Sequence, residues 1–302
     1  MPDQNLRAIL DDYAAITGIA GDTKRLHLIC LTHLERFLKR EPALADLNDL
    51  TYAKFVAWRS PKVSQETIRG DCCKLLALWR WCAGGKRRWV DPPEVKAPQP
   101  AYRLPKALDR AQLERLWEVA RVYPQRVGTL PGNIVLTAWL YVLWDTSERI
   151  GAVHQIRRDN IDLTRGWIMV DPEDRKGGQQ GRLYKVRPTT VAALTSLLAI
   201  YQGELPFGEC TVNSLYRHWA VLRNEAGLPR WATPHTIRKS HASHLVASGG
   251  DARASLGHSS DVVTNRHYLD ARITGEGKSP CDLLFDPGKE SAERPWWRRL
   301  IS

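Results

Sequence analysis

The sequence predicts a mainly α-helical protein in two parts. These are a small helical N-terminal domain and a larger, mostly helical C-terminal domain with one small antiparallel β-sheet. Apolar side chains recur at helical spacing along most of the 302 residues. A proline-rich stretch at residues 92–106 separates the two parts. One segment, residues 167–186, combines two strand-like runs with a glycine-rich connection.

The N-terminal domain, residues 1–91, is predicted to hold at least two amphipathic helices. The first is expected to begin at a cap, Asp22, and its apolar face carries Leu28, Leu31, Leu34 and Leu38. The second is expected to begin after a cap at Ser64. Its apolar face carries Ile68, Cys72, Leu75, Leu76 and Trp79.

The linker, "DPPEVKAPQPAYRLP", contains five prolines and little apolar periodicity, which is typical of a semi-extended segment. We therefore place the C-terminal domain at residues 107–302. Its first helix has Asp109 and Gln112 in capping-box positions. The run "PGNIVLTAWLYVLWDTS" is apolar on nearly all sides, as expected of a central core helix. The predicted hairpin pairs residues 167–170 with 183–186, and further helices are expected at residues 190–201, 212–225 and 235–247.

The composition indicates a globular protein, because 43% of residues are apolar and 25% are charged. The sequence contains no run of 18 apolar residues and no secretory signal pattern, so we expect a cytoplasmic location and no membrane partner. Six cysteines lack the spacing of a zinc site and are expected to be reduced, mostly buried thiols.

The chain is strongly basic, with a formal charge of +11 and a pI near 9.5. A basic surface attracts polyanions, and phosphate neutralisation dominates the affinity of such proteins for nucleic acid. Nucleic acid is therefore the first partner to consider. A basic protein without such a partner remains the alternative on charge alone.

Histidines and arginines are concentrated between Thr233 and Ser260. His235 and Arg238 lie three residues apart, so on a helix they share one face and could reach the same anion. A helix cap and a surface ion pair would explain the same two residues. His241 and His244 continue the spacing, but no carboxylate lies on the same turn, which makes a metal site there unfavourable.

Further residues of these types follow in a fixed order along the C-terminal domain. Arg149 begins a helical segment, Lys176 lies in "RKGG" at the hairpin tip, His258 lies in "LGHSS", and Tyr268 follows ten residues later. Together with H-x-x-R, this order resembles the tyrosine recombinase (phage integrase) family, and in particular Xer-like site-specific recombinases. The resemblance covers the whole C-terminal domain. The helical N-terminal domain is similar to the SAM-like core-binding domain of that family.

The resemblance implies a role for each of six residues. Arg149 and Arg238 match the two family arginines, and Lys176 matches the hairpin lysine. His235 and His258 match the active-site histidines, and Tyr268 matches the nucleophile. Lys185 also lies in the hairpin and is the alternative to Lys176, while Tyr268 could instead be an ordinary half-buried aromatic residue.

The chemistry explains why these residue types occur together. Attack on a phosphodiester adds negative charge to the phosphorus oxygens, and two always-charged guanidinium groups can hold them without a metal or cofactor. A phenol with an ordinary pKa near 10 needs a proton acceptor, for which His235 is placed best. Lys176 would protonate the leaving 5′-oxygen, and His258 would bind a non-bridging oxygen. The 3′-phosphotyrosyl link retains the bond energy, so a 5′-hydroxyl can reverse the reaction.

Two features depart from the family pattern. The family usually has an acidic residue three positions after Arg149, where this sequence has Ala152. Glu148 is a possible substitute, although on a helix it would point in a different direction. The segment Gly250–Gly257 is shorter than usual, so a helix is predicted to be missing there.

Double-stranded DNA is the implied partner, held between the two domains. Lys86, Arg87 and Arg88 are candidate phosphate contacts, or alternatively part of a solvated loop. The tail "ERPWWRRLIS" is amphipathic and is expected to be donated to a neighbouring protomer, giving a homo-oligomer that is a tetramer on DNA. Packing of the tail on its own domain is the alternative.

We therefore expect a site-specific recombinase or integrase that cuts and rejoins DNA strands. A type IB topoisomerase would share the chemistry. A catalytically degenerate DNA-binding protein would share the fold.

Overall fold

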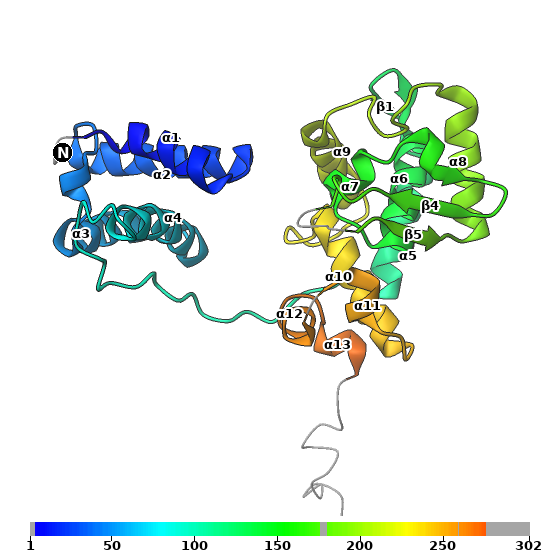
Figure 1. Ribbon diagram of the computed structural model, residues 1–302. Helices are drawn as coiled ribbons and strands as arrows, with labels where there is room; N and C mark the ends of the chain where they lie inside the picture. Colours follow the sequence, from blue (N-terminus) through cyan, green and yellow to red (C-terminus); the bar gives the residue numbers. More distant parts are fainter. Residues whose placement is uncertain (1–3, 176–179, 259, 276–302) are drawn as a thin grey trace, which may run out of the picture. The chain divides into compact units, whose positions relative to one another are not determined.

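The chain folds as two units, Met1–Arg103 and Leu104–Ser302, each with its own hydrophobic core (Figure 1). The computed structural model describes residues 4–175, 180–258 and 260–275. Lys176, Cys281 and the C-terminal tail lie outside the described residues.

The first unit is helical, as the sequence predicts, and its helices bury one face each. The helices are α1 (Leu6–Thr17), α2 (Gly21–Leu38), α3 (Asp49–Arg59) and α4 (Gln65–Ala83), with 3₁₀ turns at Leu44–Asp46 and Ser60–Lys62. The Ser64 hydroxyl accepts a hydrogen bond from the backbone N–H of Thr67, which confirms the predicted cap of α4. The predicted cap at Asp22 is wrong. Helix α2 already begins at Gly21, so Asp22 lies within its first turn and Ala20 holds the cap position.

The proline-rich segment is extended, and its first part belongs to the first unit. The Trp79 indole donates a hydrogen bond of 2.7 Å to the Asp91 carbonyl, and the Tyr52 hydroxyl donates one of 3.2 Å to the Lys96 carbonyl. These contacts attach the first part of the segment to the first unit, and the two units divide at Arg103, within the predicted linker.

The second unit is mostly helical and contains two small antiparallel sheets. Its helices are α5 (Arg110–Arg121), α6 (Gly132–Thr146), α7 (Ile150–His154), α8 (Pro188–Ile200), α9 (Val212–Glu225), α10 (Pro234–Ala247), α11 (Ala252–Leu256), α12 (Asp261–His267) and α13 (Ala271–Thr274), with a 3₁₀ turn at Arg158–Asn160. Its strands are β1 (Arg126–Val127), β2 (Leu130–Pro131), β3 (Ile161–Asp162), β4 (Trp167–Val170) and β5 (Arg182–Lys185).

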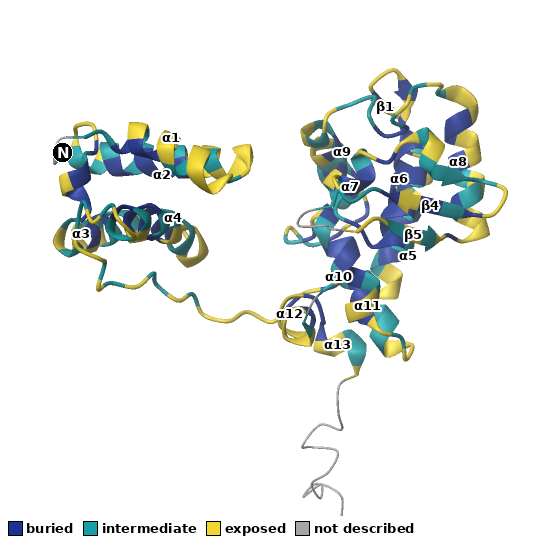
Figure 2. Cartoon of the chain, in the orientation of Figure 1, coloured by how far each residue is buried: buried dark blue, intermediate teal, exposed yellow. Residues whose placement is uncertain are grey.

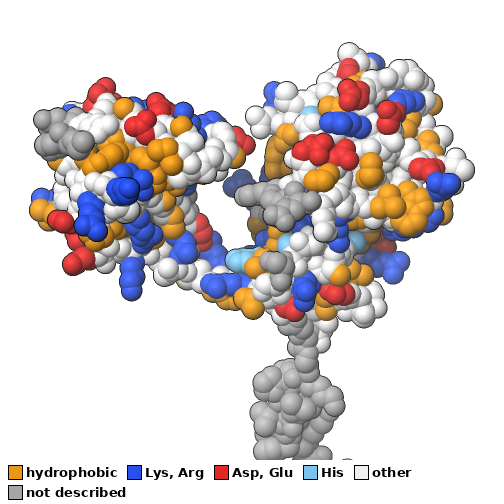
Figure 3. All heavy atoms as spheres, viewed as in Figure 1, with side chains coloured by type: hydrophobic (Ala, Val, Ile, Leu, Met, Phe, Trp, Pro, Cys, Tyr) orange, Lys and Arg blue, Asp and Glu red, His pale blue; other side chains and the backbone are white. Residues whose placement is uncertain are grey.

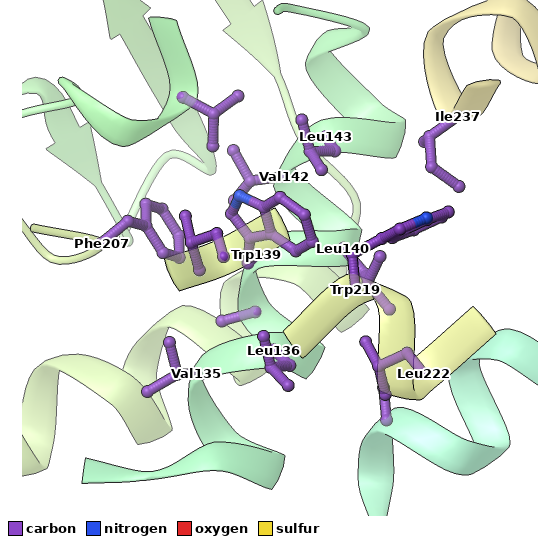
Figure 4. Packing of buried hydrophobic residues seen from close by; sticks show 14 of the residues in the cluster. Val135, Leu136, Trp139, Leu140, Val142, Leu143, Phe207, Trp219, Leu222 and Ile237 are labelled. Atoms are coloured by element: carbon purple, nitrogen blue, oxygen red, sulfur yellow. The ribbon is translucent and has the colours of Figure 1, made fainter. Parts of the chain in front are cut away.

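Helix α6 is the central core helix that its apolar sequence predicts, and it is buried along most of its length (Figure 2). The Trp139 side chain is fully buried and meets Trp219 of α9 edge to face, with 6.4 Å between ring centroids. Figure 4 shows this pair with Phe207 and Leu222 in the same cluster. Because α6 packs against α5, α8 and α10, its C-terminus has a fixed place in the unit.

The hairpin forms the predicted antiparallel pair, with β5 one residue earlier than expected. Trp167 pairs with Lys185 and Val170 with Arg182, and β3 adds a third strand at the other edge of β4. Side chains alternate along β4, with Ile168 and Val170 buried and Met169 exposed, which fixes the register against the core. The short β1–β2 pair was not predicted.

The expectation that a helix is missing before His258 is wrong. Residues Ala252–Leu256 form α11, and the Asp251 carboxylate caps it by accepting from the Ala254 backbone N–H. This helix is only about one turn long, because Gly257 ends it by adopting the left-handed region, at φ 68°.

Among the described cysteines, all are free thiols. Cys30, Cys72 and Cys82 are buried, Cys73 is exposed and Cys210 is half-buried. Over the same described ranges, no helix combines the length and apolarity needed to cross a bilayer.

Candidate active site

The turn between α6 and α7 places Arg149 where the sequence predicts, at the start of a helix. Helix α6 ends at Thr146, and Ser147 reverses the chain in the left-handed region, at φ 51°. Arg149 is then the N-cap residue of α7. Ser147 and Glu148 therefore lie in a buried turn and not on either helix.

Helix α10 brings His235 and Arg238 to one face, as expected from their spacing. It begins after Thr233, with Pro234 in its first turn. The Arg238 side chain is buried, and its Nη2 donates to the Leu256 carbonyl at 2.8 Å while Nη1 donates to the Ser147 carbonyl. Its Nη2 also lies 3.4 Å from His258 Nε2, whereas its Nε is buried without a hydrogen-bond partner.

The other histidines of α10 hold the helix in place. His241 Nδ1 lies 2.7 Å from the Trp144 carbonyl and its Nε2 lies 2.9 Å from the Ser255 hydroxyl. His244 Nε2 lies 3.0 Å from the Leu108 carbonyl. These contacts agree with packing roles. Across the described part of the chain, no three His, Cys, Asp or Glu side chains are grouped so that they could hold a metal ion.

The turn that carries His258 is held by arginines from the hairpin. Arg182 of β5 donates to the carbonyls of Ala254 and Ser255 at the end of α11. A Cβ at Gly257 would lie 2.9 Å from Arg175 Nη2 and 3.1 Å from Arg182 Nη1, so the glycine allows both guanidinium groups to approach. His258 Nδ1 shares a hydrogen bond of 2.9 Å with the Thr264 hydroxyl, which fixes the orientation of the ring.

Tyr268 lies at the end of α12, and its ring contacts the other site residues. The ring centroid is 4.6 Å from that of His258 and 5.5 Å from that of His235, and the Arg238 Cζ lies 5.6 Å from it. The side chain is 7% exposed. Ser243 of α10 fixes the following backbone, because its hydroxyl donates to the Tyr268 carbonyl and accepts from the Asp270 N–H.

The two histidines are surrounded by positive charge. Burial, together with the positive charges of Lys239, Arg238 and Arg149, lowers the pKa of His235 to about 4. Burial, Arg238 and Arg149 likewise lower the pKa of His258 to about 4. Both imidazoles are therefore neutral near pH 7, and each can accept a proton. The positive charge of Arg149 thus acts on both rings.

Glu148 supplies a buried carboxylate next to Arg238. Its Oε1 accepts hydrogen bonds from Arg175 Nε at 2.7 Å and from the Tyr184 hydroxyl at 2.6 Å, and its Oε2 lies 3.7 Å from Arg238 Nη1. Burial raises the pKa of this carboxyl, but these partners outweigh burial and the net pKa is lowered. At 3.7 Å the attraction to Arg238 is about 4 kcal/mol before desolvation is subtracted, for an effective dielectric constant near 20.

Glu148 is thus placed to act as the substitute that the sequence offered, because it lies in the turn before α7 and the direction expected on a helix does not apply. Ala152, in contrast, is buried in the main core of the unit.

The structure brings together five of the six predicted residues: Arg149, His235, Arg238, His258 and Tyr268. Lys176 lies outside the described residues. The alternative lysine, Lys185, donates to the Arg165 carbonyl and lies 5.2 Å from the Trp167 ring. Sequence reasoning missed the supporting roles of Arg175, Tyr184, Ser243 and Thr264, since no local sequence pattern marks the partners of these side chains.

Comparisons with known proteins identify the protein family of this chain. The model of the phage integrase family matches residues 106–273, which is more than half of the chain. The chain belongs to the phage integrase family. It is a site-specific recombinase, an enzyme that breaks and rejoins DNA strands.

Curated relatives and solved structures are similar to this chain over most of its length. The chain is 24% identical to tyrosine recombinase XerD of Shewanella oneidensis, over 88% of this chain and 91% of that protein. It is 26% identical to tyrosine recombinase XerC of Neisseria meningitidis, over 86% and 89% of the two chains. Its fold is similar to that of a lambda integrase dimer bound to a COC′ core site, with a TM-score of 0.69, 16% identity, and 92% and 80% of the two chains covered. The Tn1549 transposon integrase in complex with transposon right-end DNA gives a TM-score of 0.69 at 14% identity, with 90% and 97% covered.

Proposed function

We propose that Tyr268 is the nucleophile of this recombinase. The observation that carries the proposal is the convergence of His235 and Arg238, from α10, and of His258, from the turn after α11, on its ring. In this reaction the phenolic oxygen attacks a DNA phosphorus, the bond to the 5′-oxygen breaks, and a 3′-phosphotyrosyl link forms.

Arg149 and Arg238 hold the phosphate during this step. Two of the Arg238 nitrogens already bind carbonyls, so its rotamer is fixed before DNA arrives, and its unpartnered Nε is the donor available to a phosphate oxygen. Arg149 is half-buried at the start of α7, where it can supply a second guanidinium. Preorganised cations of this kind stabilise the charge that develops on the phosphorus oxygens.

His235 accepts the phenolic proton of Tyr268. Its lowered pKa keeps it neutral at physiological pH, which is the protonation state that a proton acceptor requires. His258 holds a non-bridging oxygen. Its ring is held on both sides, because Nδ1 shares a hydrogen bond of 2.9 Å with the Thr264 hydroxyl and Nε2 lies 3.4 Å from Arg238 Nη2, a donor.

Lys176 donates a proton to the leaving 5′-oxygen. Its position in "RKGG", one residue after the anchored Arg175, supports this assignment, together with its match to the family pattern. When a 5′-hydroxyl of another strand attacks the phosphotyrosyl link, the same groups act in reverse. Tyr268 then regains its proton and the DNA backbone is restored.

The substrate is double-stranded DNA, held by both units, with the first unit as the core-binding domain. Lambda integrase and the Tn1549 integrase, which share the fold, were solved on DNA. Lys and Arg side chains are spread over the surfaces of both units (Figure 3). In the loop after α4, Lys86 and Arg88 are exposed and suited to phosphate contact, whereas Arg87 stacks on the Trp81 ring at 4.2 Å.

The active assembly is a tetramer on DNA, joined by the tail "ERPWWRRLIS" of each protomer. The combination of two tryptophans, leucine and isoleucine with three arginines supports an exchanged amphipathic segment. A similar fold occurs in a lambda integrase tetramer bound to a Holliday junction, with a TM-score of 0.67 and 15% identity. The cytoplasmic location stays a prediction of the sequence.

A nicked suicide substrate tests the proposed nucleophile. Loss of the short fragment beyond the nick prevents religation, so we expect wild-type protein to accumulate as a covalent DNA adduct on denaturing gels. Tyr268→Phe should form no adduct, while its DNA affinity changes by less than about threefold, because the ring and its contacts remain. An adduct formed by Tyr268→Phe would disprove the assignment.

Two further assays, DNA binding and relaxation of a supercoiled plasmid, separate the two alternative functions. Binding of cognate DNA without any adduct would indicate a degenerate binding protein. Relaxation of supercoiled DNA without sequence preference would indicate a topoisomerase. The arguments for degeneracy, Ala152 and the short segment before His258, are weakened by the buried Glu148 and by helix α11.

A further inference from the structure

One buried carboxylate lies where three parts of the active site meet. The Glu148 side chain is 1% exposed, and its partners come from the β4–β5 connection, from β5 and from α10. Its Oε2 also accepts from the Arg149 backbone N–H at 3.3 Å. A carboxylate in this position contacts both arginine-bearing segments of the site.

Arg238 needs a compensating charge because it is 2% exposed. Its two hydrogen bonds to carbonyls satisfy donors but do not neutralise the cation. Within the described residues, Glu148 is the carboxylate found within 4.0 Å of the guanidinium. The carboxylate therefore makes it less costly to keep a charged, preformed Arg238 in the interior.

The same carboxylate also fixes the base of the hairpin. Arg175 is 12% exposed, and besides Glu148 it donates to the Gln180 carbonyl across the connection. Tyr184 of β5 donates to the same Oε1. A change in the hairpin that moved Arg175 would thus alter the charge balance at Arg238.

We infer that Glu148 is a positioning residue for strand cleavage, which fixes Arg238 and couples it to the β4–β5 hairpin. Position 152 is an alanine packed in the core and supplies no carboxylate. Glu148 supplies one instead, from the turn before Arg149. The inference rests on the proposed function, because it concerns the rate at which Tyr268 forms its covalent link.

The test compares Glu148→Gln with Asp145→Asn, a matched control. The Asp145 side chain is also buried, at 5% exposed, and pairs with Arg187 at 2.7 Å, but it contacts none of the proposed catalytic residues. Single-turnover cleavage of the suicide substrate, DNA affinity and thermal unfolding are measured for each. We expect Glu148→Gln to cleave at least about tenfold more slowly, with DNA affinity within about threefold, and Asp145→Asn to keep its cleavage rate.

Because loss of charge from a buried pair can prevent folding, Tyr184→Phe is the second variant. It removes one hydrogen bond to Glu148 and leaves every charge in place, and we expect a cleavage rate reduced about two- to fivefold. Glu148→Asp, which keeps the charge, should cleave faster than Glu148→Gln.

The outcomes are distinguishable. If wild-type protein forms no adduct, the proposed function fails. Suppose that wild-type protein does form the adduct. The inference about Glu148 is then overturned if Tyr184→Phe and every folded Glu148 variant cleave as fast as Asp145→Asn. Slow cleavage by folded Glu148→Gln or by Tyr184→Phe, with Asp145→Asn unaffected, supports it.

Discussion

At the scale of single residues, the site depends on cations and neutral imidazoles brought together around one phenol. The sequence predicted His235, Arg238, His258 and Tyr268 because their types and order are distinctive. It could not predict Thr264 or Ser243, since a hydroxyl that orients a ring or holds a carbonyl carries no pattern of its own. Glu148 was visible beside Arg149, but its direction depends on the turn at Ser147.

The lowered pKa of His235 makes a prediction about stability. Unfolding returns this pKa from about 4 to its ordinary value of 6.5, so between these pH values the unfolded chain binds a proton that the folded chain does not. The contribution of neutral His235 to the unfolding free energy is fully present above pH 6.5 and is lost as the pH falls toward 4. We expect wild-type protein to lose on the order of 1–2 kcal/mol more unfolding free energy between pH 7 and pH 5 than His235→Asn.

Urea denaturation at the two pH values measures this difference. His267→Asn removes an exposed histidine and serves as the control, which should lose as much stability as wild-type protein. An equal loss in wild-type protein and His235→Asn would show that His235 has an ordinary pKa.

At the scale of elements, the sequence predicted the long helices and the hairpin well, because periodic burial and caps determine them. The Asp109 and Gln112 capping box of α5 and the Ser64 cap of α4 are confirmed. The short elements were missed or misjudged. One-turn helices such as α11 and the two-residue strands β1 and β2 are too short to show a period, and tertiary contacts hold them.

Gly257 connects α11 to the turn that carries His258, and its replacement by alanine is expected to lower the stability of the protein. The left-handed backbone alone should cost about 1–2 kcal/mol. The new Cβ would also displace Arg175 and Arg182, and with them the Glu148 contact. We therefore expect Gly257→Ala to slow strand cleavage as well as to lower stability.

Gly249→Ala is the matched control for this substitution. Gly249 also has a positive φ, 81°, but a Cβ there would meet nothing within 4 Å. The Gly249→Ala variant should be less stable than wild-type protein but should cleave at the wild-type rate. If both variants cleave equally fast, the contact between the hairpin and the His258 turn is not needed for catalysis.

At the scale of the whole molecule, contacts between distant segments hold the end of the described chain. The Asp270 carboxylate accepts from the Ala107 N–H at 2.8 Å, across 163 residues, and so fixes the segment after Tyr268 to the start of the second unit. The sequence predicted two parts and a proline-rich segment between them. It could not show that much of this segment packs on the first unit, because those contacts use backbone carbonyls.

The tail makes a prediction about assembly. Removal of residues 293–302 deletes two tryptophans and three arginines and leaves every described contact of the active site in place. We expect the truncated protein to bind a single site with affinity within about threefold but to form at least about tenfold less tetramer on paired sites, as measured by native gels or mass photometry. Unchanged tetramer formation would indicate that the tail packs on its own domain.

The most direct test of the central claim is to locate the covalent bond. Protein trapped on a suicide substrate is digested with nuclease and trypsin, and the modified peptide is sequenced by mass spectrometry. The account predicts a 3′-phosphonucleotide on the tyrosine of the peptide spanning residues 267–272. A modification on any other residue would contradict it.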